Sequence, residues 1–191
     1  MPPASPDIHA RLETERLYLR CYAEGDGAWY YPMSLRNRTH LSRYEPENPV
    51  TAIKSEREAE VVVRSFALQW AEGRNFFLGA FDRMTDQFVA QVHVGLVSSE
   101  LPEFQIGYFV DAEHEGRGYV TEAVRAVLLF AFQDLRAFRV RLECDDTNVR
   151  SMRVAERCRM VREAHLRQNK KNRDGTFSGT MIYGLLRSEF A

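Results

Sequence analysis

The sequence predicts a mixed α/β (α+β) fold, in which one mostly antiparallel sheet of about seven strands has helices on both faces. Strand-like segments at 75–81, 88–97 and 104–110 follow one another across short polar links, which favours antiparallel pairing. The second half then alternates strand, helix, strand and helix before a closing hairpin, and this order indicates a mixed sheet. A chain of 191 residues with 45% hydrophobic residues is long enough for one substantial core.

The first third of the chain is expected to carry a tail, a strand and helices. Residues 1–10 contain three prolines and are expected to be a flexible tail, so the single domain spans 11–191. Alternation around Leu17 and Leu19 predicts a strand. Residues 23–50 are expected to form short helices and loops with an aromatic group at Trp29, Tyr30, Tyr31 and Tyr44. Ser55 can cap a helix that Gly73 ends.

The later elements follow from the same patterns. Residues 138–144 read as a strand, 148–158 as a helix, and 161–168 with 177–190 as a hairpin. Within strand 88–97, one set of alternate residues is expected in the core and the opposite set carries His93. The core set comprises Phe88, Ala90, Val92, Val94 and Leu96.

Composition and charge exclude several classes of function. The formal net charge of −1 gives no field that would attract nucleic acid or an anionic membrane. The three cysteines match neither a metal site nor a disulfide framework, so we expect a reducing, cytoplasmic setting and no metal. The N-terminus lacks the pattern of a signal peptide, and no apolar run approaches the ~20 residues of a membrane span. Monomer and homodimer both stay open.

The segment "VDAEHEGRGYVTEAVRAVLLFAF", residues 110–132, joins a strand to an amphipathic helix through Gly116 and Gly118. One apolar stripe runs along the helix, formed by Val120, Ala123, Val124, Val127, Leu128 and Ala131. A glycine turn at a helix N-terminus can bind an anion with its backbone N–H groups, although glycine can also serve only a tight connection. Thr121 replaces the third glycine of a dinucleotide fingerprint, and the Lys-Ser/Thr of a P-loop is missing.

"IGYFVDAEHEGRGYVTEAV" and "LECDDTNVRSMRVAERCRMV" together resemble the GNAT acetyltransferase superfamily, most closely the branch of ribosomal-protein alanine N-acetyltransferases. The opening "LETERLYLR" and the closing hairpin resemble that branch too, so the resemblance covers nearly the whole chain. It implies a GNAT fold and direct transfer of an acetyl group from acetyl-CoA to a primary amine, either a small molecule or a protein N-terminus. A catalytically silent CoA-binding module and a purely structural domain are the alternatives.

The resemblance implies a set of cofactor-binding residues. Backbone groups of Tyr108, Phe109 and Val110 would bind the pantetheine arm where this strand separates from the next. The diphosphate would be bound by the turn, and Asn148 would contact CoA. The turn residues are Glu115, Gly116, Arg117, Gly118 and Tyr119. Glu113 departs from the family's Gln or Arg and is expected to point outward.

The resemblance also implies catalytic roles. Glu143 would accept the amine proton, and Ser151 would protonate the leaving thiolate, because the tyrosine that other GNAT enzymes use is here Ala155. His93 is the alternative base, since histidine titrates near neutral pH. Each of these residues also has a purely structural interpretation. Glu143 would be an ion-paired strand residue, Ser151 a residue at the start of a helix, and His93 a hydrogen-bonded imidazole. Arg159 replaces a family glycine, and a positive φ there would cost about 1 kcal/mol.

Overall fold

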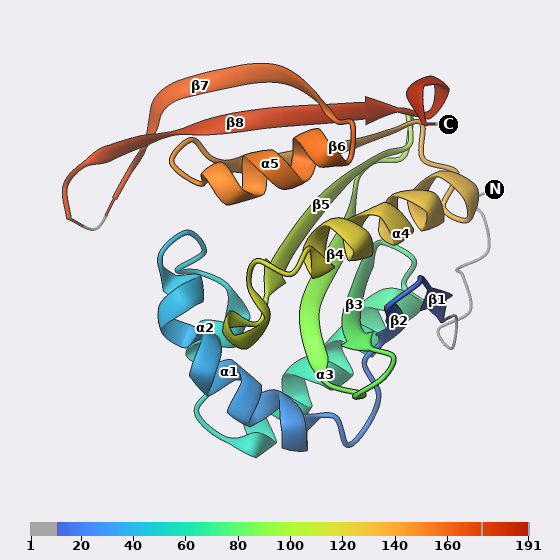
Figure 1. Cartoon of the computed structure of the whole chain (residues 1–191), viewed down its shortest axis with the longest axis vertical. Coiled ribbons are helices and arrows are strands. Elements are labelled where there is room, and N and C mark those ends of the chain that lie inside the picture. Colours follow the sequence, from blue (N-terminus) through green and yellow to red (C-terminus); the bar gives the residue numbers. More distant parts are fainter. Residues whose placement is uncertain (1–10, 173, 191) are drawn as a thin grey trace.

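The computed structural model describes residues 11–172 and 174–190, and its centre is one eight-stranded sheet (Figure 1). The strand order is β1-β2-β3-β4-β5-β6-β8-β7, and only the β5–β6 pair is parallel. The strands are β1 (Leu12–Glu13), β2 (Leu17–Cys21), β3 (Asn75–Asp82), β4 (Phe88–Ser98), β5 (Glu103–Val110), β6 (Arg139–Asp145), β7 (Val161–Lys171) and β8 (Phe177–Leu186). All seven predicted strands are present, and the two-residue β1 adds an edge. The expected tail, 1–10, lies outside the described residues.

Helices cover both faces of this sheet, as predicted (Figure 1). They are α1 (Gly27–Ser42), α2 (Pro49–Ala52), α3 (Glu56–Ala71), α4 (Tyr119–Gln133) and α5 (Val149–Arg157), with 3₁₀ turns at Ala112–His114 and Arg187–Glu189. The apolar stripe of α4 and one side of α5 pack with the larger core cluster, whereas α1 and much of α3 enclose an aromatic cluster on the other face. Within the described ranges, no helix is both long and apolar enough to span a bilayer.

Helix α1 corrects the expectation of short helices and loops for residues 23–50, because it runs for 16 residues. Its buried face includes the polar Ser34 and Asn37, and Pro32 lies inside it, so the sequence shows no apolar stripe. The Asn37 amide donates to the Asp111 carboxylate at 3.1 Å and accepts from the Ala112 N–H at 2.8 Å. These polar contacts attach α1 to the end of β5, and they add to the packing of Tyr30, Met33 and Leu41 in the aromatic cluster.

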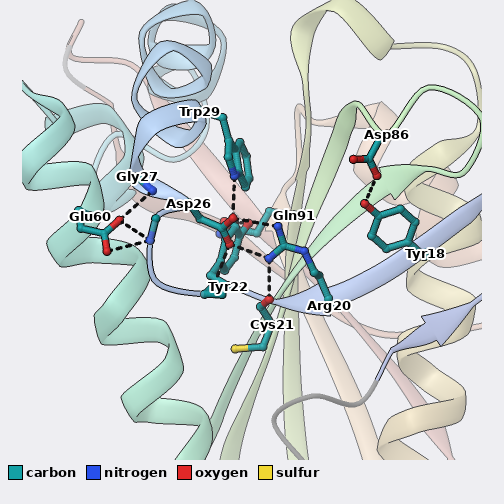
Figure 2. Close-up of polar contacts among 12 residues, drawn as sticks. Tyr18, Arg20, Cys21, Tyr22, Asp26, Gly27, Trp29, Glu60, Asp86 and Gln91 are labelled. Atoms are coloured by element: carbon teal, nitrogen blue, oxygen red, sulfur yellow. Dashed lines mark hydrogen bonds and ion pairs between the residues drawn. The ribbon is translucent and has the colours of Figure 1, made fainter.

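A buried polar network fixes the chain that enters α1 (Figure 2). The Asp26 carboxylate accepts from the Arg20 guanidinium at 2.6 and 2.9 Å and from the Trp29 indole at 2.8 Å. The Tyr22 hydroxyl donates to Gln91 Oε1 at 2.7 Å. Trp29, Tyr30 and Tyr31 of the predicted aromatic group therefore pack in or against the core. Of the four aromatic residues in that group, only Tyr44 lines the large cleft described below.

A bulge between β3 and β4 changes which side chains share a face. Phe81 pairs with Phe88 but Ala80 pairs with Ala90, so Val89 is an extra residue. Phe88 consequently packs in the aromatic cluster, and the prediction that it shares a core face with Ala90 is wrong. The prediction that Ala90, Val92 and Val94 are core residues is confirmed.

Arg159, just after α5, has a φ of 60° and is exposed. Replacing Arg159 with glycine should raise the free energy of unfolding by about 0.5–1 kcal/mol, because glycine adopts this conformation without a Cβ clash. The melting temperature should then rise by roughly 1–4 °C. Denaturant unfolding measures the change, and Arg157→Gly, inside the last turn of α5, should have the opposite effect. No gain in stability for Arg159→Gly would contradict the assignment of strain.

Candidate active site

A cleft of about 670 Å³ opens where β5 and β6 separate. Their parallel pairing ends at Ile106 and Leu142, so the following residues of the two strands have no ladder between them. The end of α1, the starts of α4 and α5, and β4 complete the walls. This opening is the separation that the resemblance implied for the strand carrying Tyr108, Phe109 and Val110.

The glycine turn forms one end of this region. Gly116 and Gly118 have φ values of +75° and +79°, and Gly118 caps α4 without a side-chain hydrogen bond. A Cβ on Gly116 would meet no atom within 4 Å, and one on Gly118 would meet only the Arg16 guanidinium at 3.6 Å. Free N–H groups at the start of α4 therefore adjoin open space, and Glu113 is exposed as expected. This arrangement suits a diphosphate.

An ion pair that the sequence did not indicate holds the turn in place. Glu122, in the first turn of α4, accepts from the Thr14 hydroxyl at 2.6 Å and from Arg16 Nε at 2.7 Å. Arg16 Nη1 also donates to the Arg117 carbonyl at 3.0 Å. The Tyr119 hydroxyl donates to Asp82 at 2.8 Å, so this side chain is directed away from the turn. Of Tyr119, only backbone groups remain for an anion.

The face of the cleft on the side of α5 holds Ser151. Its N–H donates to Asn148 Oδ1 at 3.1 Å, so Asn148 is the N-cap of α5. The Ser151 and Tyr108 hydroxyls are 2.9 Å apart, and the Tyr108 hydroxyl also donates to the Ser151 carbonyl at 3.1 Å. Burial raises the pKa of Tyr108, which therefore stays protonated at neutral pH. The resemblance implied a role for the Tyr108 backbone only, and the structure also places the Tyr108 side chain at the cleft.

The opposite face holds the two candidate bases. His93 stacks on Phe77 at 4.3 Å between centroids, and its Nε2 lies 3.1 Å from Asn75 Oδ1. Burial lowers the pKa of His93 to about 4, so its imidazole is neutral at physiological pH but is a weaker base than the near-neutral histidine expected from the sequence. Glu143 is exposed in the cleft, with Arg141 Nη2 3.5 Å from its carboxylate. The structure thus places both residues at one cleft.

The remaining predicted residues divide between backbone and surface positions. The Phe109 ring packs in the aromatic cluster, so only its backbone can serve the cleft. Arg117 is exposed, and the Glu115 carboxylate pairs with Arg150 at 2.6 Å and with His40 at 3.3 Å. Across residues 11–172 and 174–190, no three His, Cys, Asp or Glu side chains are grouped to bind a metal ion.

Comparison with known proteins finds a family model, a sequence relative and a solved structure that are similar to this chain. The family model of the acetyltransferase (GNAT) domain matches residues 16–161. A probable N-acetyltransferase of Bacillus subtilis, YjcK, is 34% identical over 97 residues, which span 50% of this chain and 54% of that relative. RimJ of Mycobacterium smegmatis, solved in complex with CoA-disulfide, has a TM-score of 0.83 at 21% identity, covering 99% of this chain and 91% of RimJ.

A second solved structure has the same fold. The ribosomal-protein-S5-alanine acetyltransferase from Vibrio fischeri has a TM-score of 0.82 at 16% identity, covering 95% of this chain and 99% of that one. At these identities the two structures establish the fold, and the family match over residues 16–161 establishes descent. The chain therefore belongs to the GNAT family of acetyltransferases.

Proposed function

We propose that this protein transfers an acetyl group from acetyl-CoA directly to a primary amine. The observation that carries the proposal is the open glycine turn beside the separated strands β5 and β6, since together they accommodate a diphosphate and an extended arm. The CoA compound bound to RimJ and the name of the Vibrio fischeri neighbour support CoA as donor and a protein N-terminus as acceptor, with a small amine as the second candidate. We propose that residues 11–191 act as one cytoplasmic domain, as monomer or homodimer and without a metal.

We infer the roles of individual residues from the family resemblance, and their positions in and beside the cleft support these roles. Backbone N–H groups of 115–119 bind the diphosphate, and backbone groups of 108–110 bind the arm and polarise the thioester carbonyl. Glu143 takes the amine proton, directly or through a water, with His93 as the alternative. Ser151 donates a hydrogen bond to the leaving sulfur, and Asn148 contacts the cofactor. The proposed proton donor and the proposed bases lie on opposite faces of the sheet, so they do not compete for one position.

A panel of primary amines and N-terminal peptides, assayed for CoA release, tests the proposal. Turnover with any of them supports an acetyltransferase. A silent CoA-binding module would give no turnover, but CoA at a hundredfold excess over Kd would still stabilise the fold by about 2.7 kcal/mol. Neither turnover nor a thermal shift would mean that the glycines serve only the turn.

Removing the Ser151 hydroxyl should lower kcat about 10-fold or more, equivalent to about 1.4 kcal/mol of transition-state stabilisation. Tyr108→Phe should produce a similar loss, because the Tyr108 hydroxyl orients the Ser151 hydroxyl from 2.9 Å. The double variant should be no slower than Ser151→Ala alone, since both hydroxyls belong to one hydrogen-bonded pair. The Kd for CoA should barely change in any of the three variants.

Tyr22→Phe is the matched control for this series, because it removes a buried tyrosine hydroxyl outside the cleft (Figure 2). It should lower the melting temperature and leave kcat unchanged. Ser151→Ala should cost little stability, because the cap of α5 is Asn148. A clear loss of stability with kcat preserved would show that Ser151 has only a structural role.

A further inference from the structure

Gly107, in the middle of β5, lacks the structural reasons that explain the other glycines of the chain. Glycine inside a strand costs about 0.5–1 kcal/mol, so its presence calls for a cause. Five of the other ten have positive φ, namely Gly25, Gly73, Gly116, Gly118 and Gly175. At the other five a Cβ would lie within 3.0 Å of another atom, namely Gly27, Gly79, Gly95, Gly179 and Gly184. Gly107 has neither feature, because a Cβ there would meet nothing within 4 Å.

The empty space beside Gly107 belongs to the cleft. Gly107 pairs directly with His93 of β4, so their side-chain positions share one face of the sheet. On the other side of Gly107, Ile106 and Leu142 are the last residues that pair β5 with β6. Gly107 and Glu143 each come one residue later on these parallel strands, so the Glu143 side chain lies on the same face of the sheet as Gly107. The row His93–Gly107–Glu143 thus crosses three neighbouring strands, with a side chain at each end and none in the centre.

We propose that Gly107 is the floor of the acceptor subsite and limits which amines can enter. This rests on the proposed acetyl transfer. Paired strands are ~4.8 Å apart, and β5 and β6 separate just before Gly107 and Glu143, so the backbones of His93 and Glu143 are separated by more than the ~10 Å of two paired strand spacings. This leaves room for one unbranched alkylamine chain above Gly107. Both candidate bases border this space, so an amine lying in it would be within reach of either one. Tyr108 and Ser151 lie on the other face, which assigns the space above Gly107 to the acceptor and not to the sulfur.

Gly107→Ala and Gly107→Val test this assignment. Because the added atoms enter empty space, the fold and the Kd for acetyl-CoA should be unchanged. The KM for a peptide or alkylamine acceptor should rise about 10-fold or more for alanine and further for valine, as expected when a pocket loses the volume of one or two methyl groups. Hydroxylamine, a much smaller acceptor, should be acetylated by the alanine variant nearly as well as by the wild type.

Ser98→Val is the control, because it adds one heavy atom, as Gly107→Ala does, on β4 outside the cleft and should leave acceptor KM unchanged. Wild-type kcat/KM in Gly107→Val would overturn the inference and leave the acetyltransferase proposal standing. A weakened CoA Kd with unchanged acceptor KM would also overturn it, by assigning Gly107 to the cofactor. If the wild type acetylates no amine at all, the proposed function fails and the inference fails with it.

Discussion

Gly118→Val is expected to weaken acetyl-CoA binding at least about 100-fold, a loss of about 2.7 kcal/mol. Gly118 has a φ of +79°, which a β-branched residue adopts only with strain. Its Cβ position faces open space apart from Arg16, so the valine methyl groups would stand where phosphate oxygens approach the helix N-terminus. Losing one or two charged hydrogen bonds accounts for a penalty of this order, since each contributes about 1.5–3 kcal/mol. Calorimetric titration with acetyl-CoA measures it.

Gly175→Val is the matched control, because Gly175 also has a positive φ, +87°, and an open Cβ position. It lies in the turn between β7 and β8, so the same strain is introduced without touching the glycine turn. Both variants should lose comparable stability, and only Gly118→Val should lose affinity. Wild-type affinity in Gly118→Val would show that the diphosphate is bound elsewhere.

Glu143→Gln is expected to lower kcat near pH 7 by about 10²-fold and to recover part of the loss at high pH. The glutamine keeps the size of the side chain but cannot accept a proton. As pH rises through the pKa of the acceptor amine, more of the amine is already neutral and the base is needed less. A pH–rate profile of kcat, measured with one acceptor at saturating acetyl-CoA, resolves the two regimes.

Glu163→Gln controls for the loss of a charge on the sheet, because Glu163 pairs with Arg139 at 2.5 Å and is not in the cleft. It should leave both kcat and the pH profile unchanged. An unaltered profile for Glu143→Gln would reassign the base to His93. In that event His93→Gln should show the loss instead, without a break near pH 6.5, because the pKa of His93 is about 4.

Much of this protein could be predicted from neighbours along the chain. The stripe that buries Ala123, Val124 and Val127 repeats at helical spacing, and the Asn148 cap acts on a residue three positions away. Gly116 and Gly118 predict the turn, because glycine adopts a positive φ without a Cβ clash. Backbone strain at Arg159 was predicted because this residue stands where the family has a glycine. Such signals depend on φ, ψ and side chains within a few residues, so the order of elements and the glycine turn at the start of α4 were predictable.

Tertiary structure decided the features that depend on contacts between distant residues. Arg16 meets Glu122 across 106 residues, and Tyr108 meets Ser151 across 43. The bulge at Val89 reversed the face of Phe88. The contacts of Tyr30, Met33 and Asn37 with distant residues stabilise a helix in a segment without an apolar stripe. The space above Gly107 exists only because β5 pairs with β4 in one register and separates from β6 after Ile106. Periodicity along a chain cannot specify register or strand separation, because both arise from packing energies summed over several elements.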